Sequence, residues 1–325
     1  MTAAPPIGVI LLNLGGPAGE WEIPHFMRRV LSDPAILSLP WPFRPLLASL
    51  IVWRRRAAVV EHYRAIGGKS PLAEQTQAQI QALQQLLGTD YLVRYVFRHS
   101  APRADAVLRE LAALGIRRII VLPAYPQWSK STTRSAMLDL MDAASEHRME
   151  VQSVHSYPTA PGLIEALAEQ AASGQNGATH VIFSAHGQLV RDVHRGDPYT
   201  QQVRETVAAL ASRLPPGVPS SLAFQSPVGP LAWTKPSLGE EIRRVGSLGC
   251  RTLVVVPVSF TCENLETLFE LDIEMARLAA AHGITSYKRI PTPGCHPAFI
   301  RTLADLVRTA ATGVFVSARE ARHDC

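Results

Sequence analysis

The chain has 325 residues, of which 47% are hydrophobic and 18% charged. This length predicts two domains of ordinary size, and the composition supplies a large core and excludes global disorder. The net charge of +5 is spread along the chain except at Arg54-Arg55-Arg56, which argues against a nucleic-acid-binding protein. We expect no secretion leader and no membrane span, and therefore a cytoplasmic protein.

Four cysteines, Cys250, Cys262, Cys295 and Cys325, lie far apart and form no CxxC pair. Their spacing argues against a zinc ribbon and against a local iron–sulfur ligand set. We expect free thiols in a reducing compartment.

Short apolar runs alternate with amphipathic segments along the chain. The predicted strands are residues 7–12, 91–97, 119–122, 151–154, 180–183, 221–224 and 253–256, and the predicted helices include 72–87, 103–114, 132–144, 162–172, 199–214 and 263–280. Several runs are almost entirely apolar, which is typical of strands covered on both faces. The alternation predicts an α/β fold of parallel sheets, in which ligands bind at the carboxyl ends of the strands.

A faint internal repeat divides the chain into similar halves. Residues 119–123 are followed by small hydroxyl residues and a helix, and residues 253–257 are followed by the same arrangement. We therefore expect an N-terminal half of residues 1–158 and a C-terminal half of residues 159–325 that ends in a short tail.

The first strand ends in a glycine pair, Gly15-Gly16, without a GxGxxG motif or a P-loop lysine. A tight turn is the simpler interpretation, and a nucleotide site is not expected. Residues 39–53 place Trp41, Phe43 and Trp53 before the three arginines. This pattern fits either an interfacial segment on anionic lipid or a buried helix with a basic last turn.

His186 follows a predicted buried strand and has only small residues, Ala185 and Gly187, as neighbours. An imidazole in this place can accept a proton or bind a metal at neutral pH. A histidine with its hydrogen bonds satisfied in a loop is the competing interpretation.

An acidic strip is predicted on the helix over residues 263–280. At about 100° per residue, Glu263, Glu266, Glu270 and Glu274 share one narrow face of an otherwise apolar helix. Unpaired like charges at this spacing destabilise a helix, so we expect the strip to line a cavity. Carboxylates there could relay protons or pass on a divalent cation such as ferrous iron.

Aromatic side chains follow two further strands. Tyr125 and Trp128 lie after one strand, and Trp233 lies after another, in turns rich in proline and glycine. Such aromatics line a ligand site about as often as they join the core.

Together these segments resemble the ferrochelatase (protohaem ferro-lyase) family. The matching segments are residues 8–17, 63–72, 94–95, 125–133, 183–187, 224–230 and 266–274, and they stand in the family's order. Any one of them is weak, but seven in order are highly specific. The resemblance extends from about residue 7 to about residue 310.

The resemblance implies two Rossmann-like halves, each a parallel sheet flanked by helices, that hold a porphyrin in the cleft between them. It implies a lyase that inserts ferrous iron into protoporphyrin IX by bending the macrocycle while two pyrrole protons leave. Iron is then a substrate and no permanent cofactor is needed. The tail over residues 312–325 contains only Cys325, so we expect no [2Fe–2S] cluster.

Residue roles follow from the same resemblance. His186 is the main proton acceptor or metal contact, Glu266 faces it across the ring, and Glu270 joins them at the metal, with Asp272 continuing the acidic path. The residues expected to contact the porphyrin are Leu14, Arg94, Tyr95, Tyr125, Ser129 and Trp233. Residues 39–56 are expected to form a lip at the pocket, with peripheral contact to the inner face of a membrane.

The chain departs from the family pattern at three places. Gln188-Leu189 replaces a common Leu-Pro pair, Pro227 replaces a basic residue, and Asn264 replaces a usual histidine. Two alternative functions remain: a chelatase for another tetrapyrrole, such as coproporphyrin or a cobalt-type substrate, and a non-catalytic porphyrin or haem carrier.

Overall fold

A computed structural model describes residues 5–41, 43–174 and 180–322, and its chain divides into two compact units. The first unit comprises Met1–Tyr125, Ser129–Ser156 and Ile300–Cys325, and the second comprises Pro126–Trp128 and Tyr157–Phe299. The main crossing lies between Ser156 and Tyr157, beside the expected boundary at residue 158. Cys325, on which the absence of a cluster was argued, lies outside the described residues.

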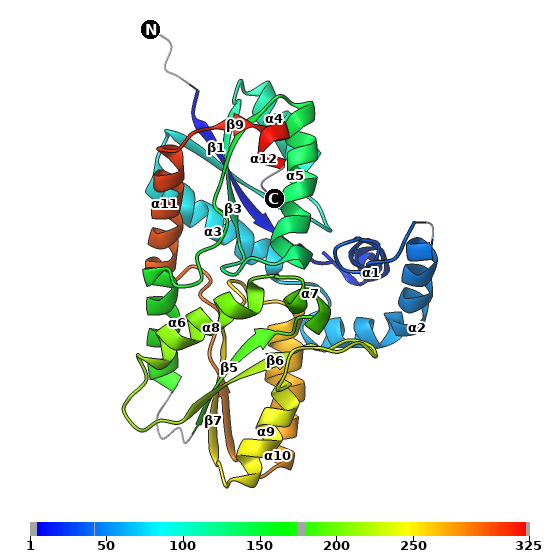
Figure 1. The fold of residues 1–325 in the computed structure, drawn as a ribbon, viewed down its shortest axis with the longest axis vertical. Coiled ribbons are helices and arrows are strands. Elements are labelled where there is room, and N and C mark those ends of the chain that lie inside the picture. The colour runs from blue at the N-terminus through cyan, green and yellow to red at the C-terminus, as the bar shows by residue number, and fades with distance from the viewer. Residues whose placement is uncertain (1–4, 42, 175–179, 323–325) are drawn as a thin grey trace. The chain divides into compact units, whose positions relative to one another are not determined.

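The first unit is built on a five-stranded sheet in the order β2-β1-β3-β4-β9 (Figure 1). Its strands are β1 (Ile7–Asn13), β2 (Tyr91–Phe97), β3 (Arg118–Pro123), β4 (Glu150–Ser153) and β9 (Val316–Ser317). Its helices are η1 (Glu20–Glu22), α1 (Ile23–Leu31), α2 (Phe43–Ala65), α3 (Leu72–Leu87), α4 (Ala104–Ala113), η2 (Lys130–Arg134), α5 (Ser135–Glu146) and α12 (Ala318–Ala321), and α11 (Pro297–Ala311) lies mostly in it. All strand pairs are parallel except β4 with β9.

The strand β9 corrects the expected extent of the C-terminal half. The sequence placed everything after residue 158 in that half, whereas β9 pairs with β4 and brings Ile300–Cys325 into the first unit. Val316 lies opposite Val151, and Ala318 in α12 belongs to the same buried core cluster as Val151. The strand has two residues, too few to produce an alternating pattern that a sequence could reveal.

The second unit repeats this topology with a four-stranded sheet in the order β6-β5-β7-β8, all parallel. Its strands are β5 (His180–His186), β6 (Ser220–Gln225), β7 (Thr252–Pro257) and β8 (Ser286–Arg289). Its helices are α6 (Pro161–Gly174), α7 (Val190–His194), α8 (Tyr199–Ala211), α9 (Leu238–Ser247), η3 (Glu266–Met275) and α10 (Ala276–Ala281). The predicted α/β fold of two parallel-sheet halves is confirmed.

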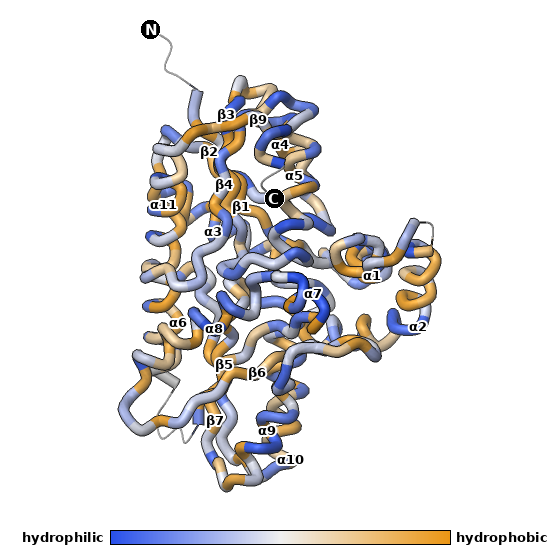
Figure 2. The backbone as a smooth tube through the Cα atoms, in the orientation of Figure 1, coloured by the Kyte–Doolittle hydropathy of each residue, from blue (hydrophilic) through white to orange (hydrophobic). Residues whose placement is uncertain are grey.

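The internal repeat has a structural counterpart. In both units the third strand in the sequence, β3 or β7, pairs beside the first, and a π-helix follows it before an α-helix begins. The central strands β1 and β7 are buried over nearly their whole length, as expected of strands covered on both faces (Figure 2). Both sheets therefore present the carboxyl ends of their central strands to the loops that carry the predicted site residues.

The glycine pair after β1 forms a close-packed turn. Gly15 has a φ of +89°, and a Cβ atom there would lie 2.2 Å from the Ser100 hydroxyl oxygen. A Cβ atom on Gly16 would lie 2.4 Å from the hydroxyl oxygen of Ser70. Both positions need glycine for packing against serines, in agreement with the tight turn expected from the sequence.

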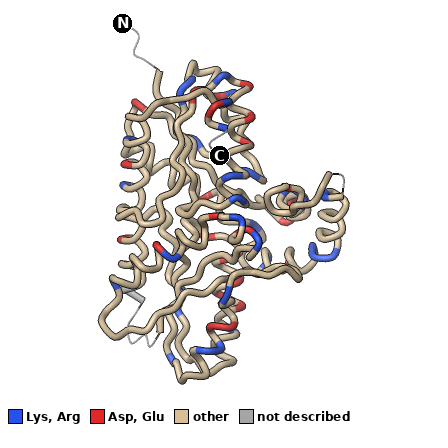
Figure 3. Tube along the Cα trace, in the orientation of Figure 1, with Lys and Arg blue, Asp and Glu red and all other residues tan. Residues whose placement is uncertain are grey.

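Helix α2 exposes an apolar stripe. Phe43, Leu46, Leu50 and Trp53 recur at helical spacing and are between 49% and 70% exposed. The helix continues to Ala65, so the three arginines lie in its middle and not in a last turn (Figure 3). The interpretation as a buried helix with a basic last turn is therefore wrong. None of the described helices is long and apolar enough to cross a membrane.

A cluster of buried charged and polar groups lies at the carboxyl end of β2. Asp33 accepts hydrogen bonds from the Ser135 hydroxyl and the Ala35 amide, and its carboxylate lies 3.2 Å from the guanidinium of Arg98. His99 Nε2 lies 3.6 Å from the same carboxylate, and both side chains are 2% exposed. Burial lowers the pKa of His99 to about 4, against the opposing pull of Asp33 and with the help of nearby arginines.

Replacement of His99 by glutamine is expected to reduce the acid sensitivity of folding. The unfolded chain takes up a proton near pH 6.5 and the folded chain only near pH 4, so the wild type loses stability as the pH falls through this window. The loss attributable to His99 is about 3 kcal/mol at most. Urea denaturation across this pH range should show a shallower decline for His99→Gln. An equal decline in both proteins, with exposed His25→Gln as the control, would contradict this assignment.

Candidate active site

His186 stands at the carboxyl end of β5, where it pairs in register with Gln225 at the end of β6. The glycine after it is required by close contacts: a Cβ atom on Gly187 would lie 2.9 Å from the Gln225 carbonyl oxygen and 3.3 Å from the Trp233 ring. The imidazole lies between two aromatic rings, with centroid distances of 6.5 Å to Trp233 and 6.4 Å to Phe260. The strand end and the small neighbour expected from the sequence thus leave this ring half-exposed.

Hydrogen bonds hold His186 in one orientation and one tautomer. Its Nδ1 lies 2.7 Å from the carbonyl oxygen of Gly187. Because a carbonyl oxygen only accepts, Nδ1 carries the hydrogen, and the lone pair of the neutral ring is on Nε2. The amide of His186 donates to the Ser259 hydroxyl at 2.9 Å, and its carbonyl accepts from the Tyr199 hydroxyl at 3.0 Å. Nε2 is therefore the atom available for a proton or a metal.

The predicted acidic strip is not formed as expected. It assumed the 100° rotation of an α-helix from Glu263 onward, but η3 begins at Glu266 and is a π-helix with wider i to i+5 turns. Glu263 lies before the helix and pairs with Arg289 at 2.6 Å. Glu274 is exposed. Of the four glutamates, Glu266 and Glu270 remain beside each other in the π-helix and near His186.

Glu270 is the carboxylate most strongly held by its surroundings. The amide of Ser226 donates to its Oε1 at 2.7 Å, and the Ser226 hydroxyl donates to its Oε2. Ser226 has a φ of +61°, which is uncommon for a residue other than glycine and aims both donors at the same carboxylate. Burial raises the pKa of Glu270, with a further contribution from Glu266, while Ser226 and His186 act in the opposite direction.

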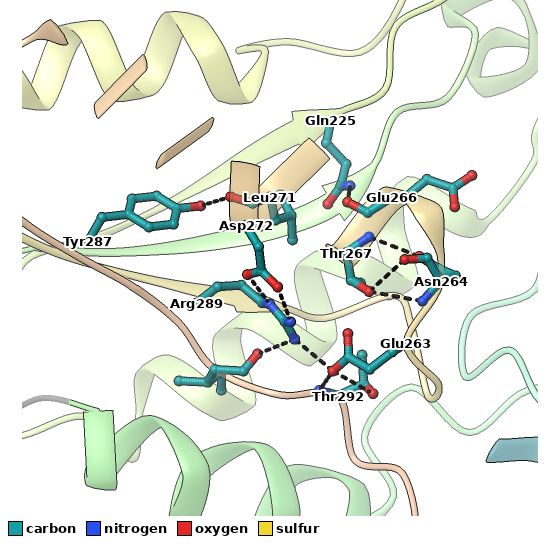
Figure 4. Close-up of polar contacts among 11 residues, drawn as sticks. Gln225, Glu263, Asn264, Glu266, Thr267, Leu271, Asp272, Tyr287, Arg289 and Thr292 are labelled. Carbon is teal, nitrogen blue, oxygen red and sulfur yellow. Dashed lines mark hydrogen bonds and ion pairs between the residues drawn. The ribbon is translucent and has the colours of Figure 1, made fainter. Parts of the chain in front are cut away.

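Two side chains fix the ends of the acidic segment (Figure 4). Asn264, which stands where the family usually has a histidine, accepts a hydrogen bond from the Thr267 amide at 3.0 Å, and Thr267 returns one from its hydroxyl to the Asn264 carbonyl. Asn264 thus acts as a helix cap. Asp272, expected to continue the acidic path, is bound by Arg289 through two hydrogen bonds of 2.8 and 2.5 Å.

The second unit therefore brings together four of the predicted residues, His186, Trp233, Glu266 and Glu270. Glu270 interacts electrostatically with both His186 and Glu266, which identifies one shared cluster. Among the residues that the structure describes, no three histidine, cysteine, aspartate or glutamate side chains are arranged to hold a metal ion.

The other five predicted residues belong to the first unit. Leu14 follows β1, Tyr125 follows β3, and Ser129 caps η2 by accepting a hydrogen bond from the Ser131 amide. Arg94 and Tyr95 are neighbours within β2, so their side chains point to opposite faces of the sheet.

The contacts of these two β2 side chains differ accordingly. Arg94 forms a 2.8 Å ion pair with Glu110 of α4. The ring of Tyr95 packs against Phe97, with ring centroids 4.9 Å apart.

Sequence analysis gave no role to several residues that shape the site. Tyr199, Ser259 and Phe260 orient or flank His186, and Ser226 holds Glu270. Three of them, Ser226, Ser259 and Phe260, follow strand ends, which was an available signal. Arg289 carried no signal, because an isolated arginine in a short polar strand resembles a surface residue.

Comparison with known proteins places this chain in a family. The family model described as ferrochelatase matches residues 6–311. A ferrochelatase of Aquifex aeolicus is 39% identical over 306 residues, which cover 93% of this chain and 98% of the relative. A ferrochelatase of a Nostoc species is 38% identical over 316 residues, covering 93% and 81%.

Solved structures support the fold. SirB from Bacillus subtilis with Fe3+ aligns with a TM-score of 0.61 at 12% identity, covering 94% of this chain and 96% of that one. CbiX, described as the terminal enzyme of sirohaem biosynthesis in denitrifying bacteria, aligns with a TM-score of 0.53 at 15% identity, covering 93% and 99%. The matched length and identity, together with the site at the end of β5, establish that the chain belongs to the ferrochelatase family.

Proposed function

We propose that this chain inserts ferrous iron into protoporphyrin IX to form protohaem. The observation that carries the proposal is the fixed tautomer of His186, whose Nε2 lone pair lies in a cluster with Glu266 and the buried Glu270. Membership of the ferrochelatase family supports the same reaction. Iron is a substrate in this scheme and not a resident cofactor.

Metalation requires two pyrrole protons to leave as iron enters the ring. His186 Nε2 accepts a proton from the macrocycle, since Nδ1 is already committed to Gly187. Glu270 has a raised pKa, so its carboxyl retains a proton at a higher pH than an exposed glutamate does and can serve as the next acceptor. Imidazole nitrogen and carboxylate oxygen are also ligands that ferrous iron accepts in transit.

The macrocycle is held by aromatic and apolar contacts. Trp233 and Phe260 flank the imidazole and supply flat surfaces against which a porphyrin is bent toward the geometry of the metalated ring. Leu14, Tyr95, Tyr125 and Ser129 of the first unit contribute further substrate contacts. Arg94 exchanges Glu110 for a porphyrin carboxylate.

We also propose that helix α2 contacts the inner face of a membrane while the protein remains cytoplasmic. The apolar stripe at Phe43, Leu46, Leu50 and Trp53 is exposed, and Arg54-Arg55-Arg56 follow it directly. Exposed apolar side chains enter the boundary of the acyl chains, and arginines bind anionic headgroups. A hydrophobic porphyrin can then be taken up from the bilayer.

Replacement of His186 by alanine is expected to lower the rate of metalation by about 10²- to 10⁴-fold, because the proton acceptor is lost. The measurement is the anaerobic conversion of protoporphyrin IX by ferrous iron, followed by absorbance. His296→Gln, a substitution of a histidine in the same unit that pairs with Glu169, is the control and should retain the wild-type rate. A wild-type rate for His186→Ala would refute the assignment. Porphyrin binding without metalation by the wild type would instead identify a carrier.

Substitution of Leu50 and Trp53 by serine is expected to abolish co-sedimentation with anionic liposomes, because it removes much of the buried apolar area. Replacement of Arg54, Arg55 and Arg56 by glutamine should weaken binding by about 1 kcal/mol for each charge, and only on anionic vesicles. Binding that is unchanged by either set would exclude α2 as the contact. Metalation of porphyrin presented in detergent serves as the control for folding.

A further inference from the structure

One guanidinium joins the two ends of the acidic segment in the second unit. Arg289, at the end of β8, donates two hydrogen bonds to Asp272 at 2.8 and 2.5 Å and a third to Glu263 at 2.6 Å (Figure 4). Its side chain is 8% exposed, and that of Glu263 is 13% exposed. Glu263 also accepts from the Thr292 amide at 2.8 Å. The opposite charges in this buried bridge are therefore paired and hydrogen-bonded, the condition under which such groups are tolerated.

The spacing of the two carboxylates is significant for the helix between them. Glu263 and Asp272 are nine residues apart, which in an α-helix is two and a half turns and would place them on opposite faces. The wider turns of the π-helix reduce this rotation. A single planar guanidinium can reach both carboxylates only when the segment has a winding of this kind.

Strand β8 provides a second attachment to the same helix. Tyr287 shares a face of β8 with Arg289, and its hydroxyl donates to the Leu271 carbonyl at 2.8 Å. From another direction, the Gln225 amide donates to the Glu266 carbonyl at 3.3 Å, and Ser226 binds Glu270. The π-helix is thus held at successive positions by side chains from β8 and from the end of β6.

We propose that Arg289 is a positioning residue for the metalation reaction. By bridging Glu263 and Asp272 it stabilises the π-helical winding of Glu266–Met275, and this winding places the carboxylates of Glu266 and Glu270 against His186. Arg289 itself touches neither iron nor porphyrin. The role in metalation rests on the proposed function, whereas the effect on the helix does not.

Asp272→Ala is the primary test. Asp272 is the most exposed member of the bridge, with 36% of its side chain accessible, and its removal leaves Arg289 paired with Glu263, so the variant is expected to fold. Asp272→Glu keeps the charge and is the conservative rescue. Arg244→Gln is the matched control, because it breaks a 2.6 Å ion pair to a buried glutamate, Glu241, on helix α9 of the same unit.

The expected result separates positioning from general destabilisation. Asp272→Ala should lower kcat about tenfold while the KM for porphyrin stays within about twofold, because a small misplacement of catalytic groups slows chemistry more than binding. Amide hydrogen exchange should accelerate over Glu266–Met275 in Asp272→Ala and stay at the wild-type rate in Arg244→Gln. Asp272→Glu should restore at least half of the wild-type kcat.

A second variant extends the test to Arg289 itself. In a double-mutant cycle, Arg289→Gln combined with Asp272→Ala should lower kcat no further than Arg289→Gln alone, because both remove one bridge. Full additivity, or unchanged hydrogen exchange over Glu266–Met275 in Asp272→Ala, would overturn the proposal. Accelerated exchange in a protein whose wild type does not metalate porphyrin would leave Arg289 as the helix anchor and overturn the proposed function instead.

Discussion

The second unit depends on the burial of one carboxylate, that of Glu270. A charged or proton-bearing group away from water is stable only when its oxygens find donors. Ser226 supplies two of them from a strained backbone conformation, and the end of β6 is shaped to present both. This constraint fixes how η3 packs on the sheet, and with it the position of Glu266 and the surroundings of His186. The chemistry follows from the cost of burying that group.

The repeated topology explains why one unit carries the acidic cluster and the other carries buried arginine contacts. Both sheets have the same order around their first strand, so equivalent strand ends are available for function in each. At the end of β6 the chain places Gln225 and Ser226, which receive a carboxylate. At the end of β2 it places Arg98 and His99, which enclose Asp33. The same scaffold thus supports opposite electrostatic environments through side-chain choice alone.

The π-helix links sheet and site in an economical way. An α-helix over the same residues would present its carboxylates at a different rotation, and the contacts from Tyr287, Arg289 and Gln225 would no longer meet their partners. A π-helix is intrinsically less favourable than an α-helix and is frequent at functional sites. Its persistence over ten residues here requires the surrounding anchors, which are drawn from two neighbouring parts of the same unit.

The sequence alone was sufficient for the two parallel-sheet halves, the strand that carries His186 and the family, because buried strands and ordered motifs leave strong local patterns. It did not reveal the pairing of β9 with β4, since a two-residue strand has no period. It also misplaced the acidic strip, because rotation per residue was assumed to be that of an α-helix. Only tertiary structure decided that Glu263 and Asp272 pair with Arg289 while Glu266 and Glu270 stay near His186: contacts between segments distant in the chain select the winding, and no local pattern encodes them.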